Sequence, residues 1–235
     1  YKQLLGDVFS AVMRKRAEND PLIGLALASR LNWRAINVLQ TYRNLYLQLG
    51  APFSREQINQ ALLIYPQCAQ VLFAAFETLF STDPAYGQPE YRQTMLLPQI
   101  KQTFLDHLQE VDEVSEDIIL RRLFNLIEHT LRTNFYLNKP SADTAIAIKL
   151  DSGKVEQMPV PAPYCEIYVH DVGMEGVHLR FGRIARGGIR WSTRSNDFRT
   201  EILGLVKTQQ TKNVVIVPVG SKGGFVVKTQ HSTRE

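Results

Sequence analysis

Apolar residues recur every three or four positions along the first 135 residues, which is the pattern of amphipathic helices. One apolar stripe runs through Leu4, Leu5, Val8, Phe9 and Val12. A second runs through Ile36, Leu39, Tyr42, Leu45 and Leu49. We detect no internal repeat in this part of the chain. The pattern therefore predicts a helical region built from several separate helices.

Residue types that begin and end helices mark the borders of these helices. The signals are a cap at Asp20, a cap at Asn32, a capping box from Ser54 to Gln57, Pro66 at a first helical position, and Gly50 beyond a last turn. Two longer helices are also predicted, over residues 91–111 and 115–133.

Near residue 138 the pattern changes to short runs rich in β-branched residues, which are typical of strands. We predict strands over residues 144–150, 165–170 and 176–181. Asp197 is placed to cap a helix that continues to Gln210. The wholly apolar run Val214–Val217 then predicts a buried strand.

A strand, a helix and another strand in succession favour an α/β arrangement. The fold class that we predict is therefore α+β with α/β character. A helical domain is expected over residues 1–137. It is followed by the N-terminal part of an α/β domain over residues 138–235.

The composition is that of an ordinary globular protein, with 44% hydrophobic and 21% charged residues. No apolar run approaches the roughly 20 residues that span a bilayer, and no signal-peptide pattern opens the chain. Cys68 and Cys165 lack metal-ligand spacing, and two buried free thiols are favoured over a disulfide. We therefore expect a cytoplasmic protein with neither a membrane nor a metal partner.

The formal net charge of +4 raises the question of nucleic-acid binding. Cations before residue 180 mostly alternate with acids, and the excess positive charge lies between Arg180 and Lys228. Trp33, Trp191 and the tyrosines do not cluster with the cations, as a single-strand binder would require. Local basicity favours a site for a small anion, and we expect no nucleic-acid partner.

Two double-glycine segments flanked by cations carry the candidate chemistry: Arg186-Gly-Gly-Ile-Arg190 and Gly220-Ser-Lys-Gly-Gly224. Glycine lets a backbone approach a ligand closely because no Cβ intervenes. Gln209 and Lys212 lie three residues apart at a helix end and share a face. Lys222 follows the apolar strand, at the end where α/β proteins bind ligands. Converging cations predict a substrate with more than one carboxylate.

Other interpretations of these segments stay open. A phosphate loop is disfavoured, because Ser221 precedes Lys222 where that motif needs glycine and Gly223 follows it where the motif needs a hydroxyl. Arg190 beside Trp191 is compatible with a surface cation–π pair. His178 alternates with apolar residues and is expected on the outer face of a strand. A scaffold or interaction module without catalysis of its own is the main alternative.

Three segments of the second half resemble the large bacterial NAD-specific glutamate dehydrogenases. They are Arg180–Ser192, Asp197–Asn213 and Val217–Phe225. Weaker similarity at residues 119–124, 130–135 and 166–169 extends the resemblance over most of the chain. Members of this family have a regulatory part before these segments and a nucleotide-binding domain after them. We therefore expect this chain to be a part of a longer protein, holding a helical segment and the beginning of a catalytic core.

The resemblance implies interconversion of L-glutamate with 2-oxoglutarate and ammonia, with NAD as the hydride acceptor. The smaller hexameric glutamate dehydrogenases carry Lys-Gly-Gly-x-Arg and Pro-x-Gly-Gly-Ala-Lys-Gly-Gly. Similarity to these motifs implies that Lys222 is the catalytic lysine, that Lys212 and Gln209 hold the substrate α-carboxylate, and that Arg186 holds the side-chain carboxylate. Gly187, Gly188 and Arg190 complete the first motif.

The chain also departs from those motifs. Arg186 replaces a lysine, which changes its reach and hydrogen-bond geometry. One glycine fewer precedes Lys222, and Lys212 aligns only with a one-residue gap. Neither the acid–base aspartate of the family nor a Gly-x-Gly-x-x-Gly motif occurs in the chain. We therefore expect NAD to bind mainly to a domain outside this chain, this part alone to be inactive, and the full-length protein to be a homo-oligomer.

Overall fold

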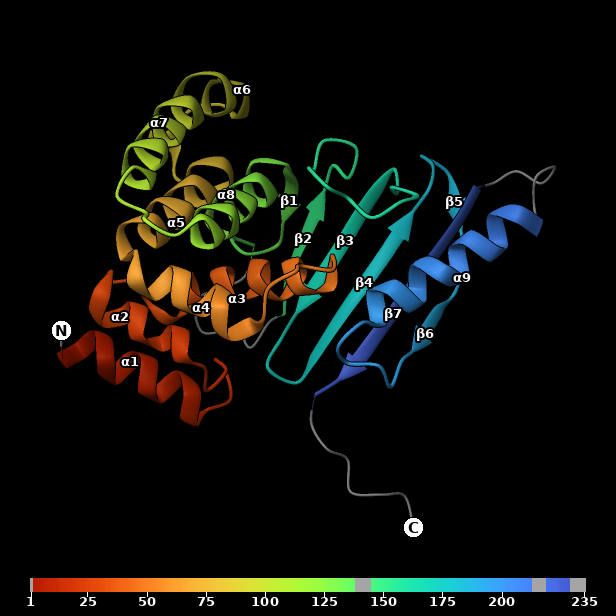
Figure 1. Cartoon of the computed structure of the whole chain (residues 1–235), viewed down its shortest axis with the longest axis horizontal. Coiled ribbons are helices and arrows are strands. Elements are labelled where there is room, and N and C mark those ends of the chain that lie inside the picture. Colours follow the sequence, from red (N-terminus) through yellow and green to blue (C-terminus); the bar gives the residue numbers. More distant parts are fainter. Residues whose placement is uncertain (1, 138–144, 213–218, 229–235) are drawn as a thin grey trace, which may run out of the picture. The chain divides into compact units, whose positions relative to one another are not determined.

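The computed structural model describes residues 2–137, 145–212 and 219–228, and the side chains of residues 209–212 are not described. The chain divides into two compact units (Figure 1). Residues 1–46, 52–128 and 136–143 form the helical unit. Residues 47–51, 129–135 and 144–235 form the sheet unit. The domain border predicted near residue 137 stays a prediction.

The described part of the helical unit contains α1 (Lys2–Met13), η1 (Pro21–Gly24), α2 (Leu25–Ala28), α3 (Trp33–Gln48), α4 (Arg55–Ile64), α5 (Pro66–Phe80), η2 (Pro84–Tyr86), α6 (Pro89–Tyr91), η3 (Arg92–Leu96), α7 (Leu97–Leu108) and α8 (Val114–Glu128). Asp20 accepts a hydrogen bond from Leu22 N at 2.9 Å, and Asn32 accepts one from Ala35 N at 3.0 Å. Ser54 starts α4 with a complete capping box. The predicted caps are confirmed, because each depends only on residues within one turn.

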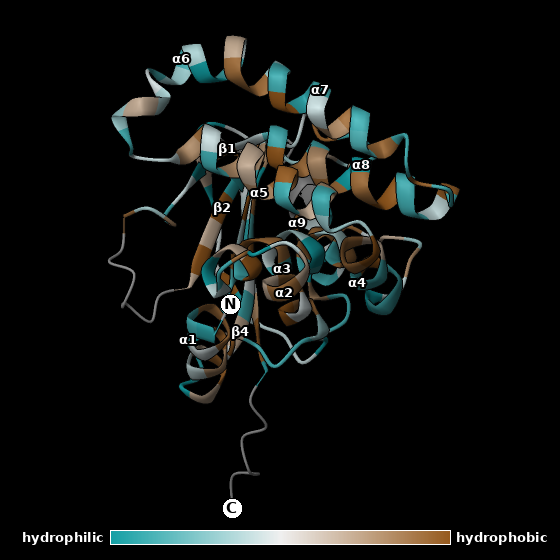
Figure 2. Ribbon diagram, turned by 90° about the vertical axis from the view of Figure 1, so that its left-hand side faces the viewer, coloured by the Kyte–Doolittle hydropathy of each residue, from teal (hydrophilic) through white to brown (hydrophobic). Residues whose placement is uncertain are grey.

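Aromatic residues fill the core of the helical unit. Phe76 of α5 is fully buried, and its ring lies 6.1 Å from that of Tyr42. Phe104 of α7 stacks on Phe124 of α8 at 4.7 Å. The alternation of hydrophobic and hydrophilic segments along α7 in Figure 2 shows its amphipathic character. No single described helix is both long and apolar enough to cross a membrane; α4 and α5 pass that test only as a pair, bent by 97°.

The described part of the sheet unit contains β1 (Thr130–Thr133), β2 (Ile146–Leu150), β3 (Cys165–His170), β4 (Met174–Arg180), β5 (Ala185–Arg186), β6 (Ile189–Trp191), α9 (Phe198–Lys212) and β7 (Val219–Val227). The strand order is β1-β2-β3-β4-β7-β5, and β6 also pairs with β7. Neighbours from β1 to β7 are antiparallel, whereas β5 and β6 run parallel to β7. A helical region followed by a mixed sheet confirms the predicted fold class.

Three element predictions need correction. The helix predicted over residues 115–133 ends at Glu128, and residues 130–133 form β1, because they pair with β2. The single helix predicted over residues 91–111 is interrupted by the π-helical turn η3, since Pro98 has no N–H to donate to the preceding turn. The segment around Lys222, predicted to follow a strand, lies inside β7. The strand predicted at 214–217 lies outside the described residues.

The two faces of the sheet differ where α9 covers it. A Cβ at Gly224 of β7 would lie 2.3 Å from Ile202 Cδ1 of α9, so the helix rests directly on this glycine. We call this side of the sheet the helix face. A Cβ at Gly223 would instead meet Ile189 and His178, on the opposite face. Successive residues of a strand point to alternate sides, so Lys222 belongs to the helix face together with Gly224.

Candidate functional site

Lys222 lies in β7 between one complete strand and one interrupted strand. On one side it is opposite Leu179 of β4, which is fully buried. On the other side, β5 pairs with Gly220 and β6 pairs from Gly223 onward. The interruption beside Ser221 and Lys222 is filled by Gly187 and Gly188 of the first double-glycine segment. The structure therefore brings the two predicted glycine motifs side by side.

The two glycines of the first motif have different roles. A Cβ at Gly187 would lie 1.4 Å from the carbonyl oxygen of Ser221, so only glycine fits there. A Cβ at Gly188 would meet nothing within 4 Å, and its carbonyl accepts a hydrogen bond from Gly223 N at 3.0 Å. We expected glycine to admit a ligand. At Gly187 it admits the neighbouring strand.

The register places the cations of the first motif on the same face as Lys222. Arg186 is opposite Gly220 and Arg190 is opposite Gly224, and both glycines share the helix face with Lys222. Paired residues of neighbouring strands point to the same side of a sheet. Arg186, Arg190 and Lys222 therefore all belong to the face that α9 covers.

Helix α9 connects the parallel strands β6 and β7, so it runs in the opposite direction to both (Figure 1). Its last residue is Lys212, three positions after Gln209. The helix therefore ends toward the beginning of β7, which is the end that carries Lys222. The structure has the order strand, helix, strand here, but the strand predicted after the helix, at residues 214–217, lies outside the described residues, as do the side chains of Gln209 and Lys212.

The three described cations of the site differ in their partners. Arg190 Nε lies 3.0 Å from Glu201 Oε1 of α9. Ser192 Oγ donates a hydrogen bond to the other oxygen, Oε2, of the same carboxylate at 2.5 Å. Within the described residues, neither Arg186 nor Lys222 lies within salt-bridge distance of an acidic group. Arg186 is exposed and Lys222 is half-buried.

Sequence reasoning missed Glu201 and Ser192 as parts of the site. In the sequence, Glu201 stands out only as a residue of the predicted helix, and Ser192 only as the end of a motif. No periodic pattern links positions nine to eleven apart across a loop. The available signal was an acidic residue, Glu201, in the first turn of the helix that follows the motif Arg186–Arg190.

A buried ion pair fixes the beginning of α9. Arg199 binds Glu166 of β3 through Nε at 2.7 Å and Nη2 at 2.6 Å, and both side chains are fully buried. The backbone N–H of Arg199 donates to Gln48 Oε1 at 3.2 Å. Such a pair is costly to bury unless its geometry satisfies both charges. The pair therefore holds the first turn of α9 at a defined place on the sheet.

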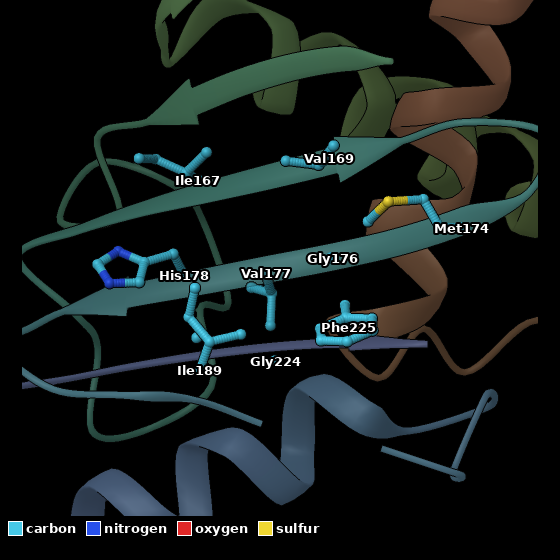
Figure 3. Close-up of a pocket in the computed structure, with 10 residues that line it drawn as sticks. Ile167, Val169, Met174, Gly176, Val177, His178, Ile189, Gly224 and Phe225 are labelled. Atoms are coloured by element: carbon cyan, nitrogen blue, oxygen red, sulfur yellow. The ribbon is translucent and has the colours of Figure 1, made fainter. Parts of the chain in front are cut away.

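The opposite face carries a separate apolar hollow of about 380 Å³ (Figure 3). It is lined by Ile167, Val169, Met174, Gly176, Val177, His178, Ile189, Gly223, Gly224 and Phe225. Burial, and then the positive charge of Arg180, lower the pKa of His178. Trp191 stacks on Phe225 here, 6.2 Å away, whereas Arg190 lies on the helix face. The cation–π pair weighed as an alternative is therefore not formed.

Two family models match the chain. Residues 103–235 match the family model described as "Bacterial NAD-glutamate dehydrogenase, catalytic domain". Residues 17–82 match "Glutamate dehydrogenase, helical motif 3". The first match begins inside α7, ahead of the sheet, and includes every candidate residue of the site.

Individual relatives cover nearly the whole chain. NAD-specific glutamate dehydrogenase of Mycobacterium tuberculosis is 40% identical over 225 residues, which is 94% of this chain and 14% of that protein. The protein of the same name from Pseudomonas aeruginosa is also 40% identical, over 95% of this chain and 14% of its own length. Glutamate dehydrogenase 2 of Dictyostelium discoideum is 29% identical over 77% of this chain and 18% of its own length. The chain thus spans about a seventh of the bacterial relatives, and it belongs to the bacterial NAD-glutamate dehydrogenase family.

Proposed function

We propose that this chain supplies the catalytic lysine and part of the substrate site of an NAD-dependent glutamate dehydrogenase. The full-length protein would convert L-glutamate to 2-oxoglutarate and ammonia. One observation supports this proposal most strongly. Arg186 and Lys222 share a sheet face at the junction of two glycine motifs, and neither has an acidic partner among the described residues. Two cations on one sheet face without compensating acids favour a ligand with several negative charges.

Each residue has a role that follows from its chemistry. Arg186 would bind the side-chain carboxylate, for which its planar guanidinium offers two parallel hydrogen bonds. Lys222 would polarise the keto oxygen of 2-oxoglutarate or the corresponding oxygen of the carbinolamine, as a positioned donor of a proton. Gln209 and Lys212, at the end of α9, would hold the α-carboxylate. Gly187 and Gly188 keep the strand that carries Arg186 next to β7.

The described residues do not fit the binding of NAD. A dinucleotide fold places a glycine-rich turn and a free helix N-terminus against the pyrophosphate. Before α9 the chain carries no such turn, and Arg194 and Asp197 bind each other there. A backbone N–H in the first turn of α9 is already taken by Gln48. We therefore propose that NAD, which the relatives' names imply, binds mainly to another part of the protein.

The substitution Lys222→Ala in the full-length protein tests the proposed role. Loss of the positioned donor should lower kcat for glutamate at least about 1,000-fold, because general acid–base groups typically contribute about 100- to 10,000-fold. Steady-state assays of NADH formation measure this effect. The melting temperature should stay near that of the wild type, since Lys222 is only half-buried.

Lys149→Ala is the matched control. Lys149 is a half-buried strand lysine of the same sheet, and its strand partner is Ile167 of the opposite face. This variant should retain wild-type kcat and KM. If both lysine variants keep full turnover, Lys222 has no catalytic role and the proposed function fails.

A further inference from the structure

Glu201 connects two segments that carry candidate substrate ligands. It lies in the first turn of α9, and only 15% of its side chain is exposed. One carboxylate oxygen pairs with Arg190 at 3.0 Å, and the other accepts a hydrogen bond from Ser192 at 2.5 Å. Both oxygens are therefore committed to β6 and the residue that follows it.

At the same place α9 lies directly against β7. Ile202, the neighbour of Glu201, lies against Gly224, and Gly224 is the β7 partner of Arg190. Ser192 N also donates a hydrogen bond to Phe225 O of β7 at 2.8 Å. The strand β6, the strand β7 and the helix α9 are thus joined at one point. Lys222 lies two residues before this point along β7.

The charges separate Arg190 from the other cations of the site. Arg190 and Glu201 together carry no net charge, so the pair adds little attraction for a dicarboxylate. Arg186 and Lys222 keep their uncompensated charges among the described residues. A substrate carboxylate at Arg190 would have to compete with a carboxylate that is already held by two interactions.

Resting on the proposed function, we infer that Glu201 is the positioning residue of this substrate site. Glu201 holds Arg190 and Ser192, and so places the Gly187–Gly188 segment and Arg186 relative to Lys222. Arg190 acts on the substrate through this contact and is not itself a carboxylate ligand.

The substitution Glu201→Gln in the full-length enzyme tests whether Arg190 is held in place by Glu201 or binds the substrate carboxylate directly. The two possibilities predict changes of KM for glutamate in opposite directions. Glutamine keeps the size and a hydrogen bond to Ser192 but removes the charge. If Glu201 positions the site, KM for glutamate should rise about tenfold or more, since misplacement by about 1 Å can cost about 100-fold. If Arg190 binds the carboxylate directly, removal of the competing acid should lower KM. An unchanged or lowered KM overturns the inference.

A neutral pair provides the second comparison. Arg190→Gln alone leaves Glu201 without its cation, whereas Arg190→Gln with Glu201→Gln restores a hydrogen-bonded pair without charge. If Glu201 positions the site, KM for glutamate should rise in the Arg190→Gln enzyme and return most of the way to the wild-type value in the double variant. A direct carboxylate ligand predicts that the double variant stays as impaired as Arg190→Gln, and this result would contradict the inference.

Hydrogen exchange supplies a readout that does not depend on turnover. The amide groups of Gly223 and Ser192 are bonded across the joint between the strands. They should exchange faster in the Glu201→Gln protein than in the wild type, and unchanged exchange overturns the inference. Full turnover of the Lys222→Ala enzyme would refute the proposed function, but it would not change the hydrogen exchange expected for Glu201→Gln. The failure of one proposal can therefore be told from the failure of the other.

Discussion

Compensation of charge by neighbouring acids distinguishes the individual cations of this site. Arg190 and Arg194 have acidic partners within the described chain, Glu201 and Asp197. The bond to Arg194 lowers the pKa of Asp197, so that pair is fully charged at neutral pH. Arg186 and Lys222 have no such partner among the described residues. Arg186 and Lys222 are therefore the two cations that can bind an added anion without first breaking an ion pair.

Adding a single methyl group at Gly187 tests whether the close approach of this residue to β7 requires glycine. The substitution Gly187→Ala would place a methyl group 1.4 Å from a backbone oxygen of β7, which neither strand can avoid by a side-chain rotation. Overpacking of this kind costs about 1–3 kcal/mol, so we expect a lower melting temperature by thermal unfolding. The shift should also raise KM for glutamate, because Arg186 is the preceding residue.

Gly188→Ala is the adjacent control for stability. No atom lies within 4 Å of a Cβ at that position, and its φ is not positive. The melting temperature of Gly188→Ala should therefore remain close to that of the wild type. Equal destabilisation by both substitutions would show that the glycine pair is needed for flexibility, not for the close approach of two strands.

For single residues, the sequence identifies which residue types form the site but not which way their side chains point or which residues they contact. The motifs alone point to Lys222, Arg186 and both glycines. Which cation has an acidic partner depends on strand register and on the approach of α9. Neither quantity has a local signature, so the motifs group Arg190 with the ligands and give no sign of Glu201.

Among the elements, helix α9 depends on a contact that crosses 33 positions of the chain. Glu166 and Arg199 are both fully buried and joined by two short hydrogen bonds. The pair sets where the helix starts on the sheet. The length of the helix then sets the position of its last residue, Lys212.

Removing the acid of this pair should be strongly destabilising. The substitution Glu166→Gln leaves the guanidinium of Arg199 buried without its counter-charge, which costs about 3–5 kcal/mol. Urea unfolding of the full-length protein, followed by hydrogen exchange in α9, measures the loss. Replacing both residues by Leu and Met should recover most of it, because apolar replacements of a buried pair are often neutral.

Arg194→Ala is the control for that experiment. Arg194 pairs with Asp197 at the same end of α9, but both side chains are largely exposed. Exposed pairs contribute little, so the urea midpoint should hardly change. A loss as large as that of Glu166→Gln would mean that any contact near the helix start matters equally, and not the buried pair in particular.

Local signals predict the elements of the helical unit well and the elements of the sheet unit less well. Asp20, Asn32 and Ser54 cap their helices with bonds that span two or three residues. Residues 130–133 continue an apolar pattern that suits a helix, yet they pair with Leu150 and its neighbours on β2. Pairing over such separations overrides local preference.

On the scale of the whole molecule, each compact unit contains one buried free cysteine: Cys68 in the helical unit and Cys165 in the sheet unit. Burial raises the pKa of Cys68 to about 11. About one molecule in 1,000 would then carry the thiolate at pH 8, and only the thiolate reacts with alkylating reagents. The two thiols can report separately on the opening of the two units.

We therefore expect that iodoacetamide leaves Cys68 unmodified in the native protein at pH 8. Modification, detected by mass spectrometry of peptides, should begin only at urea concentrations that unfold the helical unit. A pKa raised in the folded state favours folding fully below about pH 9, and this contribution is lost as the pH rises toward 11. Rapid labelling of Cys68 without urea would contradict the burial that the structure assigns to it.

The division into a helical part and a later part with strands follows from periodicity alone, since 3.6-residue and two-residue repeats differ over long stretches. The directions of the strands in the mixed sheet do not follow from it. Details at the site need spatial information, because its parts come from three segments between residues 186 and 224. The resemblance in motifs implies roles for these residues but does not indicate which face of the sheet they share.

The contact between Gly224 and Ile202 has a consequence for redesign of the proposed substrate site. Since no side chain separates the helix from the strand there, the space beneath α9 cannot be widened by trimming β7. Variants meant to accept longer or shorter diacids should therefore be sought at the exposed edge that carries Arg186. Libraries that randomise Gly187 or Gly224 would mostly return misfolded protein, because a side chain at either position overlaps a neighbouring atom.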